Sequence, residues 1–419
     1  MTTHHQILIV GGGTAGIMTA TQLLKRDKNL NIGIIEPSEK HYYQPAWTLV
    51  AGGAYKFKNT WRFMADLIPE KTTWVKDYAI VINPENNSVT TESNGVITYN
   101  YLVIAPGLIM APELIEGLPE AIDKGVACSI YIDPEYVWSS IRNFKGKNAV
   151  FTQPATPIKC GGAPQKIAYL TADYFKRKKL QNTVNITFAT PGSVIFGVEP
   201  IKKTLMKVIK RYGIDFKPFY TLYKIDSENK IIYFKNNSPD ENKCIINKDA
   251  TSTTNNNPET IAIPFDLLHI APPQTAPKFI KDSILANKEG WLDVDHYSLQ
   301  HNKFINIFGV GDVAGLPTAK TGAAIRKQVP VIVDNILLLL RQNKLGVKSY
   351  NGYSSCPLVT GYGKMVLAEF DYKSQFVPDP KLKRMFIFDS SKEHWRLWVF
   401  KKIGLPYLYW NKMMKGKNI

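Results

Sequence analysis

The sequence has 419 residues, of which 44% are apolar and 21% are charged, and its formal net charge is +17 at pH 7. This length allows two or three domains with separate cores, and the composition excludes a largely disordered chain. A positive charge of this size indicates binding to nucleic acid, to acidic ligands or to an anionic membrane.

The position of the positive charge favours a membrane. Ten Lys or Arg residues and only two acidic residues lie between 381 and 417, mixed with tryptophans and tyrosines. This mixture is typical of a membrane surface, so we expect no nucleic-acid partner. No stretch reaches the ~18 apolar residues that cross a bilayer, and no leader precedes residue 6. The sequence therefore predicts a peripheral (monotopic) protein, placed on the cytoplasmic face of a bacterial inner membrane.

The N-terminal segment predicts a dinucleotide site. An apolar strand (residues 6–10) leads into a glycine turn, a helix through residue 26 and a second strand (31–35) that ends at an acid 20 residues after the last glycine. The glycines permit a tight turn, the helix N-terminus faces a pyrophosphate and the acid accepts from a ribose hydroxyl. The expected site residues are Gly11, Gly13, Thr14, Ala15, Gly16 and Glu36.

Two later segments indicate that the dinucleotide is FAD. Residues 101–107 and 305–314 are apolar strands that end in glycine turns, the second in Gly-Asp. They resemble the two additional FAD motifs of flavoproteins with two dinucleotide folds, in which the aspartate binds the ribityl chain. A helix start follows at 317–324, where Lys320 can stabilise charge on a reduced isoalloxazine. These segments add Ala105, Gly107, Gly311, Asp312, Lys320 and Thr321 to the expected FAD site.

The turn after the strand 148–152 is where a second glycine fingerprint, for a nicotinamide nucleotide, is expected. Instead it contains three prolines, which remove backbone donors, and Cys160. Lys159, Lys166 and the following helix N-terminus favour a thiolate there. We therefore expect a thiol in place of the soluble electron donor, although a buried cysteine is often only a small apolar residue.

The other three cysteines are Cys128, Cys244 and Cys356. Cys356 lies 196 residues after Cys160 in a turn before an apparent strand (364–370), so only the fold can bring the two together. The four are too scattered for a disulfide scaffold, and none has zinc-site spacing, so we predict no metal.

The whole pattern predicts an α/β protein with two Rossmann-like dinucleotide-binding domains and a C-terminal amphipathic membrane-attachment region. The FAD domain is expected at 1–110 and 265–345, because residues 265–271 are interpreted as returning the chain to it. The second domain is expected at 111–264, with a polar, solvated excursion at about 224–260. The remainder, 346–419, is read as two short aromatic and basic helices separated at Pro406, with Lys401 and its neighbours at lipid headgroups.

Six segments spread over the chain resemble the sulfide:quinone oxidoreductases, in the branch of the mitochondrial enzymes. The resemblance covers everything except roughly 224–260, and it rests on residues 36–45, 159–166, 317–321, 356–362, 367–372 and 408–411. It implies FAD, a second nucleotide site that is not used, and a C-terminal membrane module.

The resemblance also implies a mechanism. Cys160 and Cys356 are a redox pair bridged by sulfur, sulfide attacks the bridge and leaves a persulfide on Cys356, and Cys160 passes two electrons to the flavin. The sulfur leaves to a small thiol, to sulfite or as polysulfide, and the electrons go to a membrane quinone. By analogy, Gln44 and Ala79 contact FAD, and the quinone pocket is lined by Phe370, Phe386 and Phe388. Homo-oligomerisation is left open, Cys128 is interpreted as structural, and Cys244 has no assigned role.

Three alternatives remain at this point. A type II NADH:quinone dehydrogenase shares the two folds and the anchor, but needs a glycine loop at 152–165. A flavocytochrome-type sulfide dehydrogenase subunit passes electrons to a cytochrome and lacks such a tail. A non-catalytic flavoprotein scaffold or sulfur carrier predicts bound FAD without quinone turnover.

Overall fold

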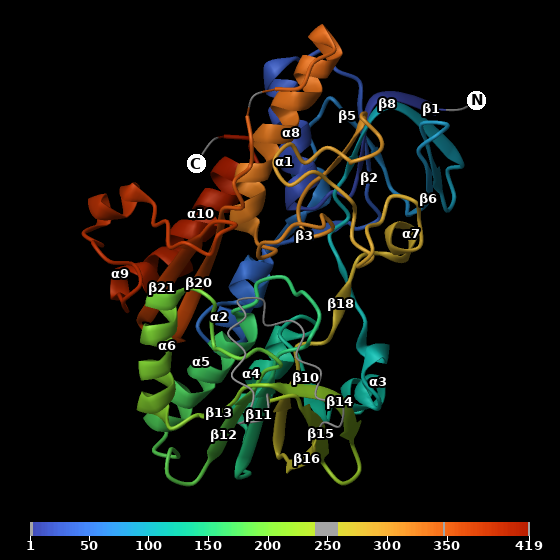
Figure 1. Ribbon diagram of the computed structural model, residues 1–419. Coiled ribbons are helices and arrows are strands. Elements are labelled where there is room, and N and C mark those ends of the chain that lie inside the picture. Colours follow the sequence, from blue (N-terminus) through green and yellow to red (C-terminus); the bar gives the residue numbers. More distant parts are fainter. Residues whose placement is uncertain (1–2, 239–258, 347, 418–419) are drawn as a thin grey trace.

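Two α/β lobes make up the molecule, and the C-terminal segment lies beside both of them (Figure 1). The computed structural model describes residues 3–238, 259–346 and 348–417. Each lobe is built on a parallel sheet, as expected for two Rossmann-like units. The N-terminal segment and residues 270–340 form the upper lobe in this view, and residues 111–269 form most of the lower lobe.

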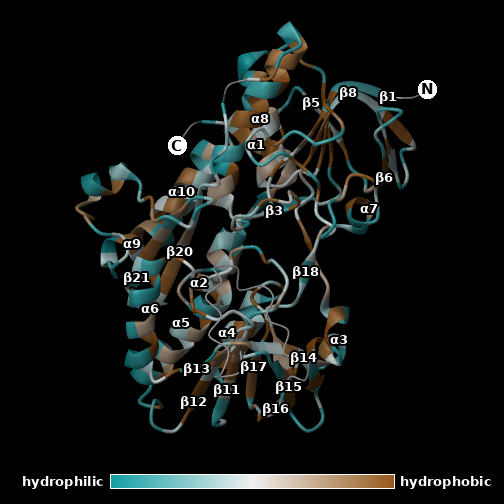
Figure 2. Ribbon diagram, viewed as in Figure 1, coloured by the Kyte–Doolittle hydropathy of each residue, from teal (hydrophilic) through white to brown (hydrophobic). Residues whose placement is uncertain are grey.

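The first sheet carries the predicted dinucleotide fingerprint. Its order is β5-β2-β1-β8-β7-β6, parallel from β5 to β8, and β19 pairs in parallel with the carboxyl-terminal half of β8. The helices α1 and α8 pack together and bury apolar side chains against it. In Figure 2, β2 and neighbouring strands of this sheet are hydrophobic, as buried parallel strands require. The bounds are β1 (Thr3–Val10), α1 (Thr14–Arg26), β2 (Ile32–Ile35), β5 (Thr72–Val75), β6 (Ala79–Asn83), β7 (Ser88–Thr91), β8 (Val96–Ile104), β19 (Ile307–Gly309) and α8 (Gly322–Gln342).

The second sheet is entirely parallel, in the order β10-β17-β11-β12-β13. Residues 265–271 were expected to rejoin the first domain, but β17 pairs with β10 and β11, so they complete this sheet instead. The chain returns through β18, which pairs with β9. The bounds are β9 (Ile109–Met110), α3 (Leu118–Asp123), β10 (Ala127–Cys128), α4 (Pro134–Arg142), β11 (Asn148–Thr152), α5 (Ala163–Arg177), β12 (Asn185–Ala189), α6 (Glu199–Tyr212), β13 (Asp215–Lys217), β17 (Leu267–His269), β18 (Gln274–Thr275) and α7 (Lys278–Lys281).

The expected solvated excursion is in part an ordered antiparallel sheet. β14 (Tyr220–Asp226), β15 (Ile231–Asn236) and β16 (Glu259–Pro264) pair in sequence, and Ile232 and Phe234 are fully buried. Alternating apolar residues in β15 pack one face of this sheet on the lobe. Cys244 and the asparagine-rich stretch lie outside the described residues.

A hairpin and a continuous helical run follow α8. The strand β20 (Ser354–Gly361) packs on α5, and its partner β21 (Lys364–Phe370) packs on α9. Next come α9 (Trp395–Val399), a π-helical turn (Phe400–Gly404), α10 (Leu405–Leu408) and a second π-helical turn (Tyr409–Met413). The predicted break at Pro406 is wrong, because this proline lies in the first turn of α10, where a helix tolerates it. Of the helices in the described ranges, none combines the length and apolar character needed to cross a bilayer.

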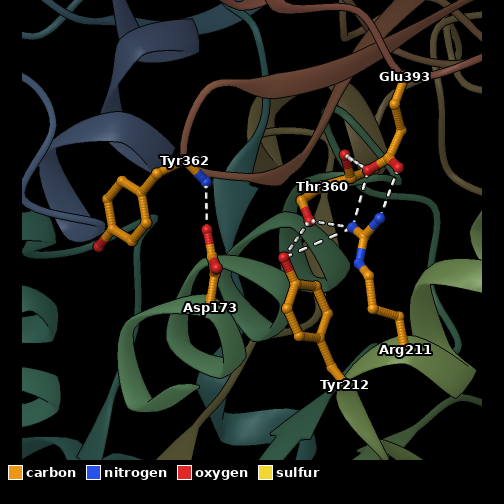
Figure 3. A network of polar contacts seen from close by, with 6 residues as sticks. All are labelled: Asp173, Arg211, Tyr212, Thr360, Tyr362 and Glu393. Atoms are coloured by element: carbon orange, nitrogen blue, oxygen red, sulfur yellow. Dashed lines mark hydrogen bonds and ion pairs between the residues drawn. The ribbon is translucent and has the colours of Figure 1, made fainter. Parts of the chain in front are cut away.

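A polar network fixes this C-terminal part to the second lobe (Figure 3). Arg211 on α6 makes a two-pronged ion pair with Glu393, at 2.6 and 2.8 Å, just before α9. It also donates to the carbonyl oxygen of Thr360 at 3.2 Å, where the hairpin turns. Burial alone would raise the pKa of Glu393, but hydrogen bonds from Arg211 and Thr360 outweigh it and lower this pKa. The pair therefore stays ionised at neutral pH.

We expect Arg211→Met to lower the free energy of unfolding by about 2 kcal/mol, because it leaves a charged acceptor without its bidentate donor. The thermal midpoint should fall by roughly 3 °C. The matched control is Lys202→Met on the same helix, which removes an exposed pair with Glu199 and should change stability by less than about 0.5 kcal/mol. Equal effects of the two variants would contradict a tethering role for Arg211.

Candidate active site

The glycine turn between β1 and α1 forms one end of a large cavity. Gly11 has φ +104°, and a β-carbon there would lie 2.4 Å from the carbonyl oxygen of Ala105. A β-carbon at Gly16 would lie 1.9 Å from the carbonyl oxygen of Gly11, so neither position accepts a side chain. By contrast, Gly13 faces open space where α1 begins. The turn is therefore shaped to bring backbone N–H groups up to an anionic ligand.

The cavity has a volume of about 720 Å³ and runs from this turn to Cys160 and to the C-terminal helices. Glu36 lines it at the end of β2, where its carboxylate accepts from the N–H groups of Gly12 at 2.7 Å and Ser38 at 2.8 Å. Asp312 lines it after β19. Burial raises the pKa of Asp312, although Lys159 and Lys320 lower it. The open cradle at Gly13 and the carboxylates in the wall fit a dinucleotide with hydroxyl groups along its length.

Cys160 is held in the turn between β11 and α5 in a left-handed conformation, with φ +52°. Its N–H donates to the carbonyl oxygen of Lys320 at 2.8 Å, and the N–H of Lys159 donates to the side chain of Gln274 at 2.9 Å. Cys160 thus sits where the first lobe meets the second. An N–H committed in this way is not available to a pyrophosphate.

Cys356 was expected in a turn, but it lies in the strand β20. Its sulfur atom lies 3.5 Å from that of Cys160, and both cysteines are free. The register of the hairpin pairs Cys356 with Ala368 and Ser355 with Glu369. Cys356 therefore faces α5, where a β-carbon on Gly162 would approach its sulfur at 2.7 Å, while Ser355 and Glu369 line the cavity. The adjacent residues Ser355 and Cys356 therefore face opposite sides of the strand, Ser355 toward the cavity and Cys356 toward Cys160.

Two buried lysines set the charge of the pair. The ammonium group of Lys166 lies 2.9 Å from the sulfur of Cys160. The hydrogen bond with Cys356 lowers the pKa of Cys160 well below its usual range, and Lys166 and Lys401 lower it further against the opposing effect of burial. The Cys160 thiolate in turn raises the pKa of Cys356 well above its usual range. The site therefore holds one thiolate, at Cys160, and one thiol.

The C-terminal helical run closes the cavity. Tyr409 is buried, and its hydroxyl lies 2.6 Å from the hydroxyl of Thr14 and 2.5 Å from Nε2 of His41. Burial lowers the pKa of His41 to about 4, so this histidine is neutral near pH 7. Lys401 donates to the carbonyl oxygen of Pro45 at 2.7 Å. Burial first, and then Lys166, lowers the pKa of Lys401 to about 7.

Most of the predicted FAD residues lie around one cavity. Its wall includes Gly13, Thr14, Ala15, Glu36, Gln44, Ala105, Gly107, Gly311, Asp312, Lys320 and Thr321. Ala79 is not in this wall but on β6, packed against the outer core of the first lobe. Lys320 is more constrained than expected, because its ammonium group donates to the carbonyl oxygens of Asp312 and Ala314 at 2.6 and 3.0 Å.

The three predicted quinone residues do not line the cavity either. Phe386 and Phe388 are 67% and 75% exposed, and Phe370 packs on Phe196. The wall on this side is instead formed by other residues, among them Leu367, Glu369, Leu382, Met385, Phe400, Leu405 and Leu408.

Sequence reasoning also missed Lys401, which was expected at lipid headgroups but is 2% exposed. Helical spacing contained the signal, because Lys401 follows the buried Leu397 by four residues and precedes the buried Tyr409 by eight.

Comparisons with known proteins agree with this geometry. Residues 5–330 match the model of the pyridine nucleotide-disulphide oxidoreductase family, which implies a flavin cofactor. The chain is 38% identical over 415 residues to a mitochondrial sulfide:quinone oxidoreductase of Mus musculus, covering 99% of this chain and 87% of that protein. The chain belongs to the sulfide:quinone oxidoreductase family.

A second sulfide:quinone oxidoreductase, the mitochondrial protein of Dictyostelium discoideum, is 38% identical over 420 residues, covering 98% of this chain and 86% of that protein. The fold matches the crystal structure of the sulfide:quinone oxidoreductase from Aquifex aeolicus, with a TM-score of 0.75 at 20% identity, covering 99% of this chain and 92% of that one. The predicted resemblance is thus confirmed over nearly the whole chain.

Proposed function

We propose that this protein oxidises sulfide to sulfane sulfur at Cys160 and Cys356 and passes the two electrons through FAD to a membrane quinone. One observation carries the proposal: two free thiols, 196 residues apart in sequence, lie 3.5 Å apart beside a buried lysine at the wall of a dinucleotide-shaped cavity. Family membership supports the same activity.

The cavity wall supports FAD as the flavin. Gly13 and Thr14 at the N-terminus of α1 would hold the pyrophosphate, Glu36 a ribose hydroxyl, and Asp312 the ribityl chain. When bound, the flavin accepts two electrons from sulfur and releases them to a quinone. The chain's own part is to orient it between the first lobe, the Cys160 turn and the C-terminal helices.

The sulfur atoms support a bridged resting state. Their separation of 3.5 Å exceeds the ~2.05 Å of a disulfide bond and leaves room for one sulfur atom between them. Attack of HS⁻ on the Cys356 side of such a bridge breaks one S–S bond. It leaves a persulfide on Cys356 and a persulfide anion on Cys160, next to the Lys166 ammonium. Transfer of the outer sulfur of Cys356 to a thiol or sulfite frees this cysteine to re-form the bridge as two electrons leave.

An anaerobic stopped-flow experiment tests the proposal against an NADH dehydrogenase. We expect sulfide, and not NADH, to bleach the flavin absorbance, because the N–H of Cys160 is committed to Lys320 and the turn carries prolines and no G-x-G-x-x-G fingerprint. Bleaching by NADH alone would overturn the assignment. Reoxidation of the reduced flavin by quinone, but not by cytochrome c, separates this protein from the cytochrome-coupled class. Reoxidation by either acceptor excludes a non-catalytic carrier.

We also propose peripheral attachment to a membrane through the C-terminal helical run. Trp395, Val399, Ile403 and Tyr407 follow one another at intervals of four and are 60%, 41%, 65% and 57% exposed. This apolar stripe lies on the opposite side from the buried Lys401, and basic residues such as Arg396 and Lys402 flank it. An exposed apolar stripe with flanking cations is typical of an interfacial helix.

The double variant Trp395→Ser/Ile403→Ser should bind anionic vesicles at least about tenfold more weakly, since each side chain forfeits ~1–2 kcal/mol of burial in the interface. Co-sedimentation with vesicles measures this. The control is Ile305→Ser, an apolar residue of the first lobe that is 69% exposed and should leave binding unchanged. Unaltered sedimentation of the double variant would refute attachment through this stripe.

A further inference from the structure

A buried carboxylate lies in the cavity wall on the side away from the thiols. Glu369 on β21 is 2% exposed and belongs to the lining. It accepts a hydrogen bond of 2.5 Å from the hydroxyl of Tyr353 and one of 2.9 Å from the N–H of Asp379. Neither the sulfur chemistry nor the dinucleotide site uses this group. None of the residues that the structure describes forms an ion pair with it, and a buried carboxylate of this kind needs an explanation.

A second cavity is also lined by Tyr353. It has a volume of about 610 Å³ and a polar lining. Four residues of its wall, Arg326, Tyr353, Asp379 and Lys381, also line the main cavity. Arg326 donates to the hydroxyl of Tyr353 at 2.9 Å and holds it in place, and this hydroxyl donates to Glu369. The second lone pair of the Tyr353 oxygen can accept from water, so the hydroxyl can link the side cavity to the carboxyl group.

The surroundings of Glu369 favour its protonated form. Burial raises the pKa of its carboxyl, although hydrogen bonds from Tyr353 and Asp379 lower it. The charged groups that face it are Asp379, which raises this pKa, and Arg326, which lowers it; Lys327 on α8 lies near both. Burial also raises the pKa of Tyr353, so its hydroxyl keeps a proton to donate.

A quinone that accepts two electrons also takes up two protons to become a quinol, and a pocket facing a membrane has no bulk water to supply them. We propose that Glu369 delivers protons to the quinone and regains each one through the Tyr353 hydroxyl from water in the side cavity. This inference rests on the proposed function, which supplies the electrons. In each transfer the O–H bond of the carboxyl breaks, an O–H bond forms on the quinone, and Tyr353 hands on a proton while it receives another.

The test uses purified holoenzyme reduced anaerobically with one equivalent of dithionite, so that sulfide chemistry plays no part. Reoxidation is followed at saturating decylubiquinone and, separately, with ferricyanide, which takes electrons without protons. We expect Glu369→Gln to slow reoxidation by quinone at least about 100-fold and to leave reoxidation by ferricyanide within about twofold of wild type. Tyr353→Phe should give a smaller loss with quinone only.

The control is Asp371→Asn, which neutralises a carboxylate just beyond β21 that accepts from the N–H groups of Lys373 and Gln375 and does not line the cavity. It should match wild type with both acceptors. A wild-type quinone rate in Glu369→Gln, or an equal loss with both acceptors, would overturn the proposal. If reduced wild-type protein reacts with ferricyanide but never with quinone, the proposed function fails instead.

Discussion

Cys160→Ser and Cys356→Ser should each lower sulfide-dependent quinone reduction by at least about 10,000-fold while leaving the flavin bound. A serine hydroxyl forms neither a persulfide nor a sulfur bridge, and groups that act as a unit fail together when one is removed. Neither cysteine is among the residues proposed to hold the pyrophosphate, the ribose or the ribityl chain, so binding of the dinucleotide should not depend on them. Flavin absorbance and a sulfide-plus-quinone assay measure the two outcomes.

Cys128→Ala is the matched control for these variants. Cys128 is buried in β10, and burial raises the pKa of its thiol to about 12, so it stays protonated and unreactive. The variant should keep the wild-type rate of sulfide oxidation. A wild-type rate in either of the serine variants would remove the basis for a paired role, whereas loss of flavin from them would assign the cysteines to the cofactor site.

The second large effect is expected from Lys166→Met. Loss of the ammonium group 2.9 Å from the sulfur should raise the pKa of Cys160, because an opposite charge at that distance stabilises the thiolate. The same ammonium group stabilises the persulfide anion that sulfide is proposed to leave on Cys160, and either anion is lost as pH falls through its pKa. The acid limb of the pH–rate profile for flavin reduction by sulfide should therefore move to higher pH, with the larger loss of rate on the acidic side of neutrality.

Lys401→Met provides the comparison for this shift. Lys401 also lowers the pKa of Cys160, but its own pKa of about 7 means that it is fully charged only below neutrality, and it makes no hydrogen bond to the sulfur. The acid limb of the pH–rate profile of Lys401→Met should shift in the same direction, by a smaller amount. A larger shift for Lys401→Met than for Lys166→Met would contradict the assignment of Lys166 as the main cation that stabilises the thiolate.

Features that depend on local spacing could be predicted from the sequence. The glycine turn, the acid at Glu36 and the Gly-Asp turn at Asp312 each occupy one short segment, so their geometry follows from the residues themselves. The turn at Cys160 was recognisable because it replaces a fingerprint at a known place in the fold.

Features that depend on packing between segments could not be predicted from the sequence. Pro357 made residues 353–361 look like a turn, but in a two-stranded hairpin a proline can face away from the partner, so Cys356 lies in a strand. The apolar residues 265–271 suit either parallel sheet, and only the pairing of β17 with β11 decides between them. Phe386 and Phe388 were chosen by residue type, without a periodicity to show which way they face.

The two faces of β20 have a chemical consequence. Quinones are electrophiles to which sulfur nucleophiles add readily, and an active site that houses both reagents risks inactivating itself. Because Cys356 and Ser355 point to opposite sides of one strand, its backbone separates the Cys356 sulfur, which carries the proposed persulfide, from the part of the cavity that Glu369 and Ser355 line. An insertion of one residue before Cys356 would reverse that alternation and expose the sulfur to covalent capture by its own oxidant.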